Sequence, residues 1–203
     1  MRRILFSTLL VGVAAISLST EVLAEDNWIV RARVALVAPD ASSNNVPGVG
    51  TLDVDNNITL GLDITRFFTP NLAAELILGT TTHEVVASTL GSIGSVSVLP
   101  PTLTLQYHFA PNATFRPYAG IGINYTIFYN KTGDTLSTLD LDDSFGPAFQ
   151  LGADWMLTKR ASINFDVKYI GIETEVSNNV TGVKLFDLDV NPWVIGIGVG
   201  YRF

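Results

Sequence analysis

The sequence predicts an all-β protein, an eight-stranded antiparallel transmembrane β-barrel with short periplasmic turns and long extracellular loops. Apolar residues recur at every second position in eight segments, which is the period of a β-strand. The connections between these segments alternate between short and long, and with the even number of strands this is typical of outer-membrane barrels. The apolar face of each segment is too bulky for the interior of an eight-stranded barrel, so we expect it to face lipid.

The composition excludes several classes of protein. The chain has 203 residues, of which 47% are hydrophobic and 15% are charged, and it has no cysteine. Without cysteine it cannot hold a disulfide scaffold, a thiolate zinc site or a cysteine nucleophile. Its formal net charge of −7 argues against a nucleic-acid partner, because nucleic-acid binding usually requires a basic patch.

Residues 1–24 have the pattern of a secretory signal peptide. Arg2 and Arg3 precede a largely apolar run of about 15 residues, and a small-residue cleavage site ends at Ala24. The run is too short for a membrane helix, which needs roughly 20 apolar residues. We therefore expect the signal peptide to be removed and the barrel domain to comprise residues 25–203, beginning at Glu25. A retained amphipathic or core helix is the alternative.

The first four predicted strands alternate large apolar residues with polar, charged or small ones. Residues 28–38 alternate apolar side chains with two arginines, and residues 58–66 alternate isoleucine and leucine with threonine, glycine and aspartate. Residues 72–83 and 101–109 continue this period. Each segment is long enough for a tilted strand to cross a bilayer, which takes roughly 9 to 11 residues.

The last four predicted strands are residues 116–129, 145–157, 161–173 and 190–203. The final strand shows the alternation most clearly, because Trp193, Ile195 and Ile197 share one face while Gly196 and Gly198 share the other. We expect the small glycines to point into the narrow interior and the large side chains to point out. A soluble lipocalin-like barrel, the alternative, would have the opposite orientation.

The connections predict which end of the barrel faces the periplasm. Residues 67–71, 110–115 and 158–160 form short turns. The long connections, which are rich in glycine, serine, asparagine and aspartate, are residues 39–57, 85–100, 130–144 and 175–189. With both termini in the periplasm, the long connections lie on the extracellular side.

Aromatic residues gather near the strand ends, as expected for two girdles where lipid meets water. The girdle near the short turns comprises Trp28, Phe67, Phe68, Tyr107, Phe109, Trp155, Tyr201 and Phe203. The girdle near the long connections comprises Tyr129, Tyr169 and Trp193.

The side chains predicted to point inward separate by height in the lumen. Charged residues lie in the periplasmic half or near the middle, namely Arg31, Arg33, Lys168 and Arg202 with Asp63, Glu75, Asp154 and Asp166. Buried charges are stable only when paired, so we expect a charged floor that blocks water and ions. Above it we expect an apolar lumen without ionisable groups, lined by Val37, Ile77, Phe128, Ile170, Ile172 and Val194.

An apolar solute in this upper lumen would leave more easily sideways into the bilayer than downward past the charges. The alternative is that the charged network only stabilises the barrel, because buried networks can fix a unique core without transporting anything.

Four segments carry a further signal. They are PPTLTLQYHF at residues 100–109, RPYAGIGINYT at 116–126, LDDSFG at 141–146 and NPWVIGIGVGYRF at 191–203. These segments resemble the OmpW/AlkL family of Gram-negative outer-membrane barrels. The resemblance implies a monomeric barrel that admits small hydrophobic solutes across the outer membrane, surrounded by its lipid and lipopolysaccharide. Tyr201 and the terminal Phe203 resemble the signal that the barrel-assembly machinery reads.

The residues give little support for catalysis or metal binding. His83 and His108 are predicted near opposite ends of the membrane, so they cannot form a metal pair. We expect no catalytic role for either, because catalysis would need a nucleophile, a base and an orienting group within hydrogen-bond reach. Asp140, Asp142 and Asp143 lack the spacing and the closing glutamate of a calcium loop, and we expect them to be solvated. Loose bridging of divalent cations or lipopolysaccharide is the alternative. We expect no cofactor.

The sequence therefore favours a passive conduit for small hydrophobic molecules, because the upper lumen is predicted to be apolar. The alternative function is a non-conducting structural or surface-interaction barrel whose long loops bind a partner. An enzyme is not expected.

Overall fold

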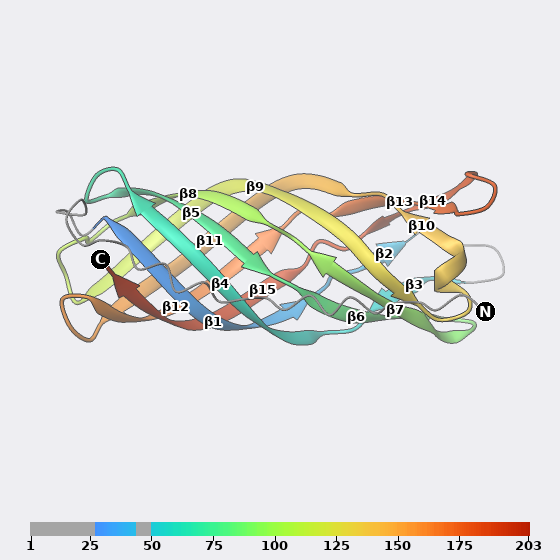
Figure 1. The fold of residues 1–203 in the computed structure, drawn as a ribbon, viewed down its shortest axis with the longest axis horizontal. Coiled ribbons are helices and arrows are strands. Elements are labelled where there is room, and N and C mark those ends of the chain that lie inside the picture. The colour runs from blue at the N-terminus through green and yellow to red at the C-terminus, as the bar shows by residue number, and fades with distance from the viewer. Residues whose placement is uncertain (1–26, 44–49) are drawn as a thin grey trace, which may run out of the picture.

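The computed structural model describes residues 27–43 and 50–203, so the predicted signal peptide, residues 1–24, lies outside the described residues. In these ranges eight antiparallel strands close into a barrel, which confirms the predicted fold (Figure 1). In order around the barrel they are β1 (Trp28–Ala38), β4 (Asn57–Phe67), β5 (Leu72–Gly79), β8 (Thr102–His108), β9 (Phe115–Thr132), β11 (Ser144–Met156), β12 (Ala161–Ile170) and β15 (Trp193–Arg202). The barrel is closed because β15 pairs with both β12 and β1. No helix in the described part of the chain is long and apolar enough to span a membrane.

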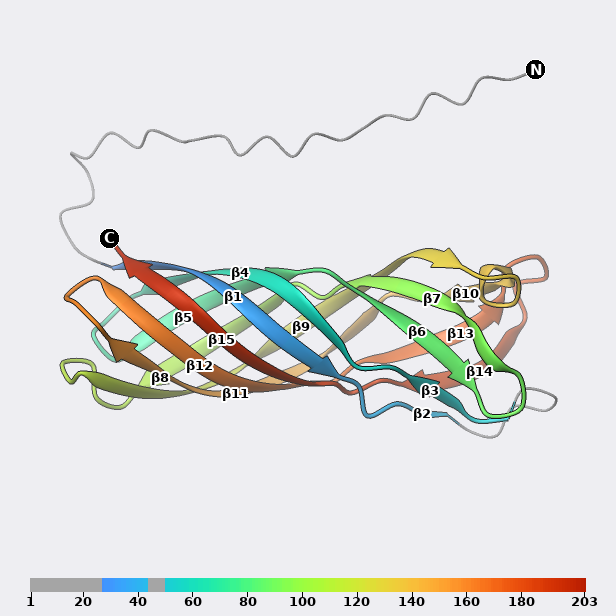
Figure 2. The same ribbon diagram turned by 90° about the horizontal axis from the view of Figure 1, so that it is seen from below.

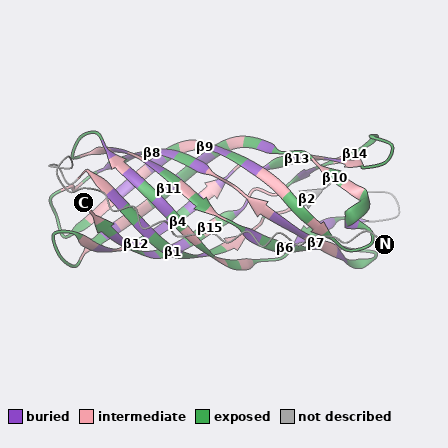
Figure 3. Ribbon diagram, in the orientation of Figure 1, coloured by how far each residue is buried: buried purple, intermediate pink, exposed green. Residues whose placement is uncertain are grey.

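Residues along each strand alternate between the interior and the outer surface, as the sequence predicts (Figure 3). On β1, Arg31 is fully buried while Val34 is 45% exposed. The arginines fit inside because glycines of β15 lie opposite them, with Arg31 paired to Gly200 and Arg33 to Gly198. A Cβ atom at Gly200 would lie only 3.1 Å from Cγ of Arg31, so the missing side chain makes room for the arginine.

The short turns and the C-terminus share one end of the barrel, the end that we assign to the periplasm (Figures 1 and 2). The start of β1 and the end of β15 meet there, since the backbones of Trp28 and Phe203 exchange hydrogen bonds of 3.1 and 2.9 Å. Thr69 and Thr158 stabilise two of the turns, because each hydroxyl accepts hydrogen bonds from backbone N–H groups two and three residues later.

The segments predicted as long loops contain regular structure that their composition did not predict. The elements are β2 (Ser42–Ser43), β3 (Leu52–Val54), β6 (Thr81–Ala87), β7 (Gly91–Leu99), the short 3₁₀ helix η1 (Leu136–Thr138), β10 (Leu139–Leu141), β13 (Glu173–Asn178) and β14 (Lys184–Asp189). The strands predicted over residues 72–83 and 161–173 end earlier in the barrel, and their last residues begin β6 and β13. In one group the sheet runs from β9 through β7 and β6 to β3, and in the other from β10 through β13 and β14 to β2. Together they lengthen the barrel at the end opposite the C-terminus (Figure 1). We call this part the extracellular extension.

A small hydrophobic core holds the extracellular extension together. Its buried residues are Leu52, Val85, Ala87, Ile93, Val96, Leu136, Val176 and Leu188. They come from both groups of strands and from η1, so this core joins the two groups. The extension is therefore a folded part of the molecule.

One assignment to the aromatic girdles is wrong. Phe67 is only 5% exposed and packs inside the barrel, with its ring 4.8 Å from that of His108. The alternation explains this, because Phe67 has the same parity on β4 as the buried Asp63 and Thr65. Other members of that girdle, including Tyr107 and Trp155, are about half exposed on the outer surface.

Candidate functional site in the barrel lumen

Arg31 is the centre of the charged network in the lower lumen. Its guanidinium lies 3.1 Å from carboxylate oxygens of both Asp63 and Glu75. It also donates two hydrogen bonds to Asp154, from Nε at 3.2 Å and from Nη2 at 2.8 Å. Arg31 therefore joins carboxylates from β4, β5 and β11 across the full width of the lumen.

Arg33 and Lys168 complete the network one level above. Arg33 binds Asp63 and donates from Nη1 to both oxygens of Asp166, at 3.0 and 2.9 Å. Lys168 forms an ion pair with the same Asp166. Asp63, Glu75 and Asp166 are thus each shared between two cations, which helps to offset the cost of burying their charges.

Uncharged polar groups tie the carboxylates together, and the sequence analysis missed them. Gln150 donates to Glu75 at 2.9 Å and to Asp166 at 3.1 Å. Asn164 donates to Asp154 at 2.9 Å and to the hydroxyl of Tyr118 at 3.0 Å. The signal that could have identified these residues is the strand alternation, because all lie at inward positions.

We call the seven residues Arg31, Arg33, Lys168, Asp63, Glu75, Asp154 and Asp166 the charged floor. All seven are at most 5% exposed. The predicted eighth member, Arg202, lies at the periplasmic end, where its guanidinium carbon is 4.7 Å from the centre of the Phe67 ring. Arg202 is the last residue of β15, which accounts for its place at this end.

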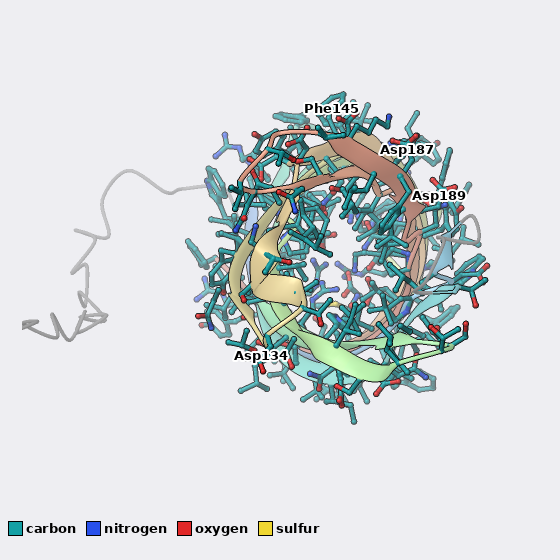
Figure 4. All side chains as sticks on the ribbon, turned by 90° about the vertical axis from the view of Figure 1, so that its right-hand side faces the viewer. Asp134, Phe145, Asp187 and Asp189 are labelled. Atoms are coloured by element: carbon teal, nitrogen blue, oxygen red, sulfur yellow. The ribbon has the colours of Figure 1, made fainter. Side chains whose placement is uncertain are left out.

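A cavity of about 110 Å³ lies above the charged floor. Its lining includes all six residues predicted for the apolar upper lumen, Val37, Ile77, Phe128, Ile170, Ile172 and Val194. Arg33 and Lys168 form its bottom, and Val85, Val96, Leu141 and Leu188 of the extracellular extension contribute to its upper wall. Figure 4 looks into the barrel from the extracellular end and shows side chains projecting inward from all sides, with Asp134 and Asp187 on opposite sides of the rim.

Two polar residues of β6, Thr81 and His83, also line the cavity. The expectation of an upper lumen without ionisable groups is therefore wrong. Both residues have the same parity as Glu75 and Ile77, so the alternation continued past Gly79 would have placed them inside. The Nδ1 atom of His83 donates to the backbone carbonyl of Asp55 at 2.7 Å.

The barrel wall is interrupted beside the cavity. The ladder between β5 and β8 ends at Ile77 and Thr102, and the ladder between β6 and β7 begins at Thr81 and Val98. Within the described residues, no strand pairing joins residues 78–80 to residues 99–101. Pro100 and Pro101 explain the interruption, because proline has no N–H to donate to a ladder. We call this interruption the wall gap; Leu78, Gly79 and Pro100 line the cavity beside it.

No cluster of three or more His, Asp or Glu side chains suited to a metal ion occurs among the residues that the structure describes. His83 lines the upper cavity, whereas His108 lies between Phe67 and Tyr118, with ring centres 4.8 and 4.9 Å away. Asp140 accepts a hydrogen bond from Lys131 at 2.8 Å, which lowers the pKa of its carboxyl. Asp143 accepts one from Tyr125 at the same distance.

Comparison with known proteins identifies the family. A model of the OmpW family matches residues 24–203, which is the whole barrel domain. The chain belongs to the OmpW family. Outer membrane protein W of Vibrio cholerae is 41% identical over 194 residues, covering 88% of this chain and 89% of that protein. This relative is an outer-membrane protein, and so is this chain.

The similarity extends to structure. The crystal structure of the outer membrane protein OprG from Pseudomonas aeruginosa matches with a TM-score of 0.77 at 35% identity, covering 87% of this chain and 95% of that one. A more distant relative of this chain is the "Dibenzothiophene metabolism operon protein PahQ" of Pseudomonas aeruginosa. The two are 27% identical over 190 residues, and the alignment covers 88% of this chain and 90% of that protein. The match to OprG shows that the barrel of this chain has the fold of a solved outer-membrane protein.

Proposed function

We propose that the protein is a passive conduit for small hydrophobic molecules across the outer membrane. The observation that supports this most strongly is the cavity, whose wall above the charged floor is predominantly aliphatic and aromatic. An apolar molecule gains about 25 cal/mol for each Å² of apolar surface that it removes from water. The charged floor beneath is buried and internally hydrogen-bonded, which disfavours the passage of water and ions toward the periplasm.

We propose that the solute leaves sideways through the wall gap into the bilayer. An apolar molecule moving down the lumen would have to separate Arg31 and Arg33 from their carboxylates, which is costly in a buried site. The wall gap offers another route, because its residues line the cavity and Leu78 is also 45% exposed on the outer surface. The name of PahQ, which refers to the metabolism of dibenzothiophene, an apolar aromatic compound, agrees with this class of solute.

The route of the chain to the outer membrane is also a proposal. We infer that residues 1–24 are a signal peptide, which is supported by the family match beginning at residue 24. We infer that Tyr201 and Phe203 are read by the barrel-assembly machinery. Tyr201 is 52% exposed on the outer surface, and Phe203 follows directly after β15, so both are available at the periplasmic edge.

The conduit can be tested by placing a charge in the upper lumen. Ile170 is 4% exposed, lines the cavity and lies opposite Ala148 in the ladder between β11 and β12. We expect Ile170→Asp to reduce uptake of a small apolar probe by about tenfold or more, because a carboxylate in a narrow lumen holds water and disfavours an apolar molecule. Ile170→Leu, which keeps the volume and polarity, should retain uptake.

Uptake is measured in cells carrying each variant at matched levels in the outer membrane, with a deletion strain as the baseline. Equal uptake by wild type, Ile170→Asp and the deletion strain would reject the conduit and would favour the non-conducting interaction barrel.

A further inference from the structure

Thr81 has an unusual position in the cavity wall. Its side chain is 8% exposed and lines the cavity, and its hydroxyl is the buried side-chain polar atom without a hydrogen-bond partner among residues 27–43 and 50–203. A buried hydroxyl left without a partner is destabilising, so its presence calls for a ligand or another compensating role.

His83 presents a second free hydrogen-bonding atom to the same cavity. It lies two residues after Thr81 on β6, so both side chains project from the same face of the strand. Its Nδ1 atom donates to the carbonyl of Asp55, and within the described part of the chain its Nε2 atom has no hydrogen-bond partner. Burial lowers the pKa of His83, which lies in the extracellular extension, so the ring is neutral at neutral pH and Nε2 accepts hydrogen bonds.

Other polar side chains around the cavity already have partners. Thr59 donates to the carbonyl of Thr80, and Thr126 donates to the side-chain oxygen of Asn124 at 2.6 Å. Asn124 in turn donates to Thr102 at 2.9 Å, and Arg33 and Lys168 bind carboxylates of the charged floor. Among the described residues, the hydroxyl of Thr81 and Nε2 of His83 are therefore side-chain hydrogen-bonding atoms of the cavity wall that have no partner of their own.

We propose that Thr81 and His83 form a binding subsite for the hydroxyl group of a small, otherwise apolar alcohol or phenol. A ligand hydroxyl both accepts and donates, so it can accept from Thr81 and donate to His83. A hydrocarbon satisfies neither atom, and a carbonyl compound satisfies only Thr81. The volume of about 110 Å³ is of the same order as the cavity of about 150 Å³ that holds benzene in another protein, so a ligand with a single aromatic ring matches the cavity in size. This inference rests on the proposed conduit and names the class of solute that its cavity retains.

Phenol and toluene provide a matched pair of probes, since they differ only by the exchange of a hydroxyl for a methyl group. The full chain, extracted from outer membranes in detergent, is titrated with each probe by NMR, and the ratio of the two dissociation constants is compared between variants. This comparison cancels the partition of each probe into the micelle. Loss of one net hydrogen bond corresponds to about a fivefold change in affinity.

We expect Thr81→Val, which keeps the volume of the side chain, to reduce the preference for phenol over toluene by about fivefold. Thr59→Val is the matched control, because it makes the same chemical change in the same cavity at a hydroxyl that is already paired, and it should leave the preference unchanged. Thr81→Val should also unfold at the same temperature as wild type or higher, because it removes an unpaired buried hydroxyl.

Each result has a definite meaning. An unchanged preference in Thr81→Val, or a lower unfolding temperature, would overturn the subsite, since the hydroxyl would then be unused or held by the protein. If both probes bind wild type without any effect of Thr81→Val, only the subsite fails and the conduit stands. If neither probe binds wild type and toluene uptake matches the deletion strain, the conduit fails as well.

Discussion

At the scale of single residues, Arg31 and Lys168 contribute unequally to the charged floor. Arg31 contacts Asp63, Glu75 and Asp154, and among the described residues the other partner of Asp154 is the amide of Asn164. In the same part of the chain Lys168 pairs with Asp166, and that carboxylate also receives hydrogen bonds from Arg33 and Gln150. Removing Arg31 leaves a buried carboxylate without a cation, whereas removing Lys168 does not.

We expect Arg31→Met to destabilise the barrel by about 3–5 kcal/mol, because breaking a buried pair leaves an uncompensated charge. Lys168→Met should cost clearly less, since Asp166 keeps the guanidinium of Arg33 at 2.9 Å. The free energy of unfolding is measured by urea titration of each variant refolded into liposomes. A loss for Lys168→Met as large as that for Arg31→Met would mean that the cations are not shared as the structure indicates.

Strand parity explains what could be predicted at this scale. Parity alone placed the seven residues of the charged floor inside the barrel, because a strand side chain has only two directions. The partners of each residue could not be predicted, since they depend on distances across the lumen between strands far apart in sequence. Phe67 was misplaced because it was assigned by its nearness to a turn, although its parity indicated the interior.

At the scale of elements, the wall gap interrupts one ladder without shifting its register. Ile77 pairs with Thr102 below the gap and Thr81 pairs with Val98 above it. The pairing is therefore in the same register on both sides of the gap. This register places Gly79 opposite Pro100, where the backbone hydrogen bonds of the ladder are absent. The gap is narrow and depends on local backbone chemistry, so a single cross-link should close it.

We expect a disulfide between Gly79→Cys and Pro100→Cys to lower uptake of an apolar probe to the level of the deletion strain, and reductant to restore it. The register on both sides of the gap places the two positions opposite each other, and a disulfide forms when the Cα atoms come within about 4.4–6.8 Å. The chain has no cysteine of its own, so no other disulfide can form.

The control is the double variant Val34→Cys with Ile197→Cys, which places a disulfide between two outward-facing residues of an intact ladder. Identical uptake by the oxidised and reduced gap variant would rule out exit through the gap.

The strands of the extracellular extension show the limit of sequence patterns at this scale. Residues 184–189 alternate in burial over only six positions, and β10 spans only three. Such short alternations are hard to distinguish from a loop, particularly beside glycine, serine and asparagine. Most barrel strands are longer and repeat the alternation several times, so all eight were predicted, although the strand predicted over residues 72–83 is divided between β5 and β6.

At the scale of the whole molecule, the barrel and the extracellular extension are stabilised in different ways. Every barrel strand is hydrogen-bonded to two neighbours in a closed ring. The extension depends on short ladders and on the hydrophobic core around Leu136, which is 3% exposed on η1. Parts held by few buried contacts open locally at lower free energy than the whole molecule. We therefore expect the extension to open without unfolding of the barrel.

This expectation can be measured with trypsin added outside intact cells. Among the described residues, Lys131 and Lys184 are the basic residues of the extension, and both are held by acidic partners, Lys131 by Asp140 and Lys184 by Glu175 and Asp187. Leu136→Ala should accelerate cleavage after these lysines by at least tenfold, because truncating a buried leucine costs about 2–5 kcal/mol. The thermal unfolding of the barrel should change little.

The control is Leu90→Ala, which truncates a leucine that is 55% exposed in the same extension and should behave like wild type. If Leu136→Ala instead lowered the unfolding temperature of the barrel in step with cleavage, the two parts would form one cooperative unit, and the extension could not open independently to admit a solute to the cavity below it.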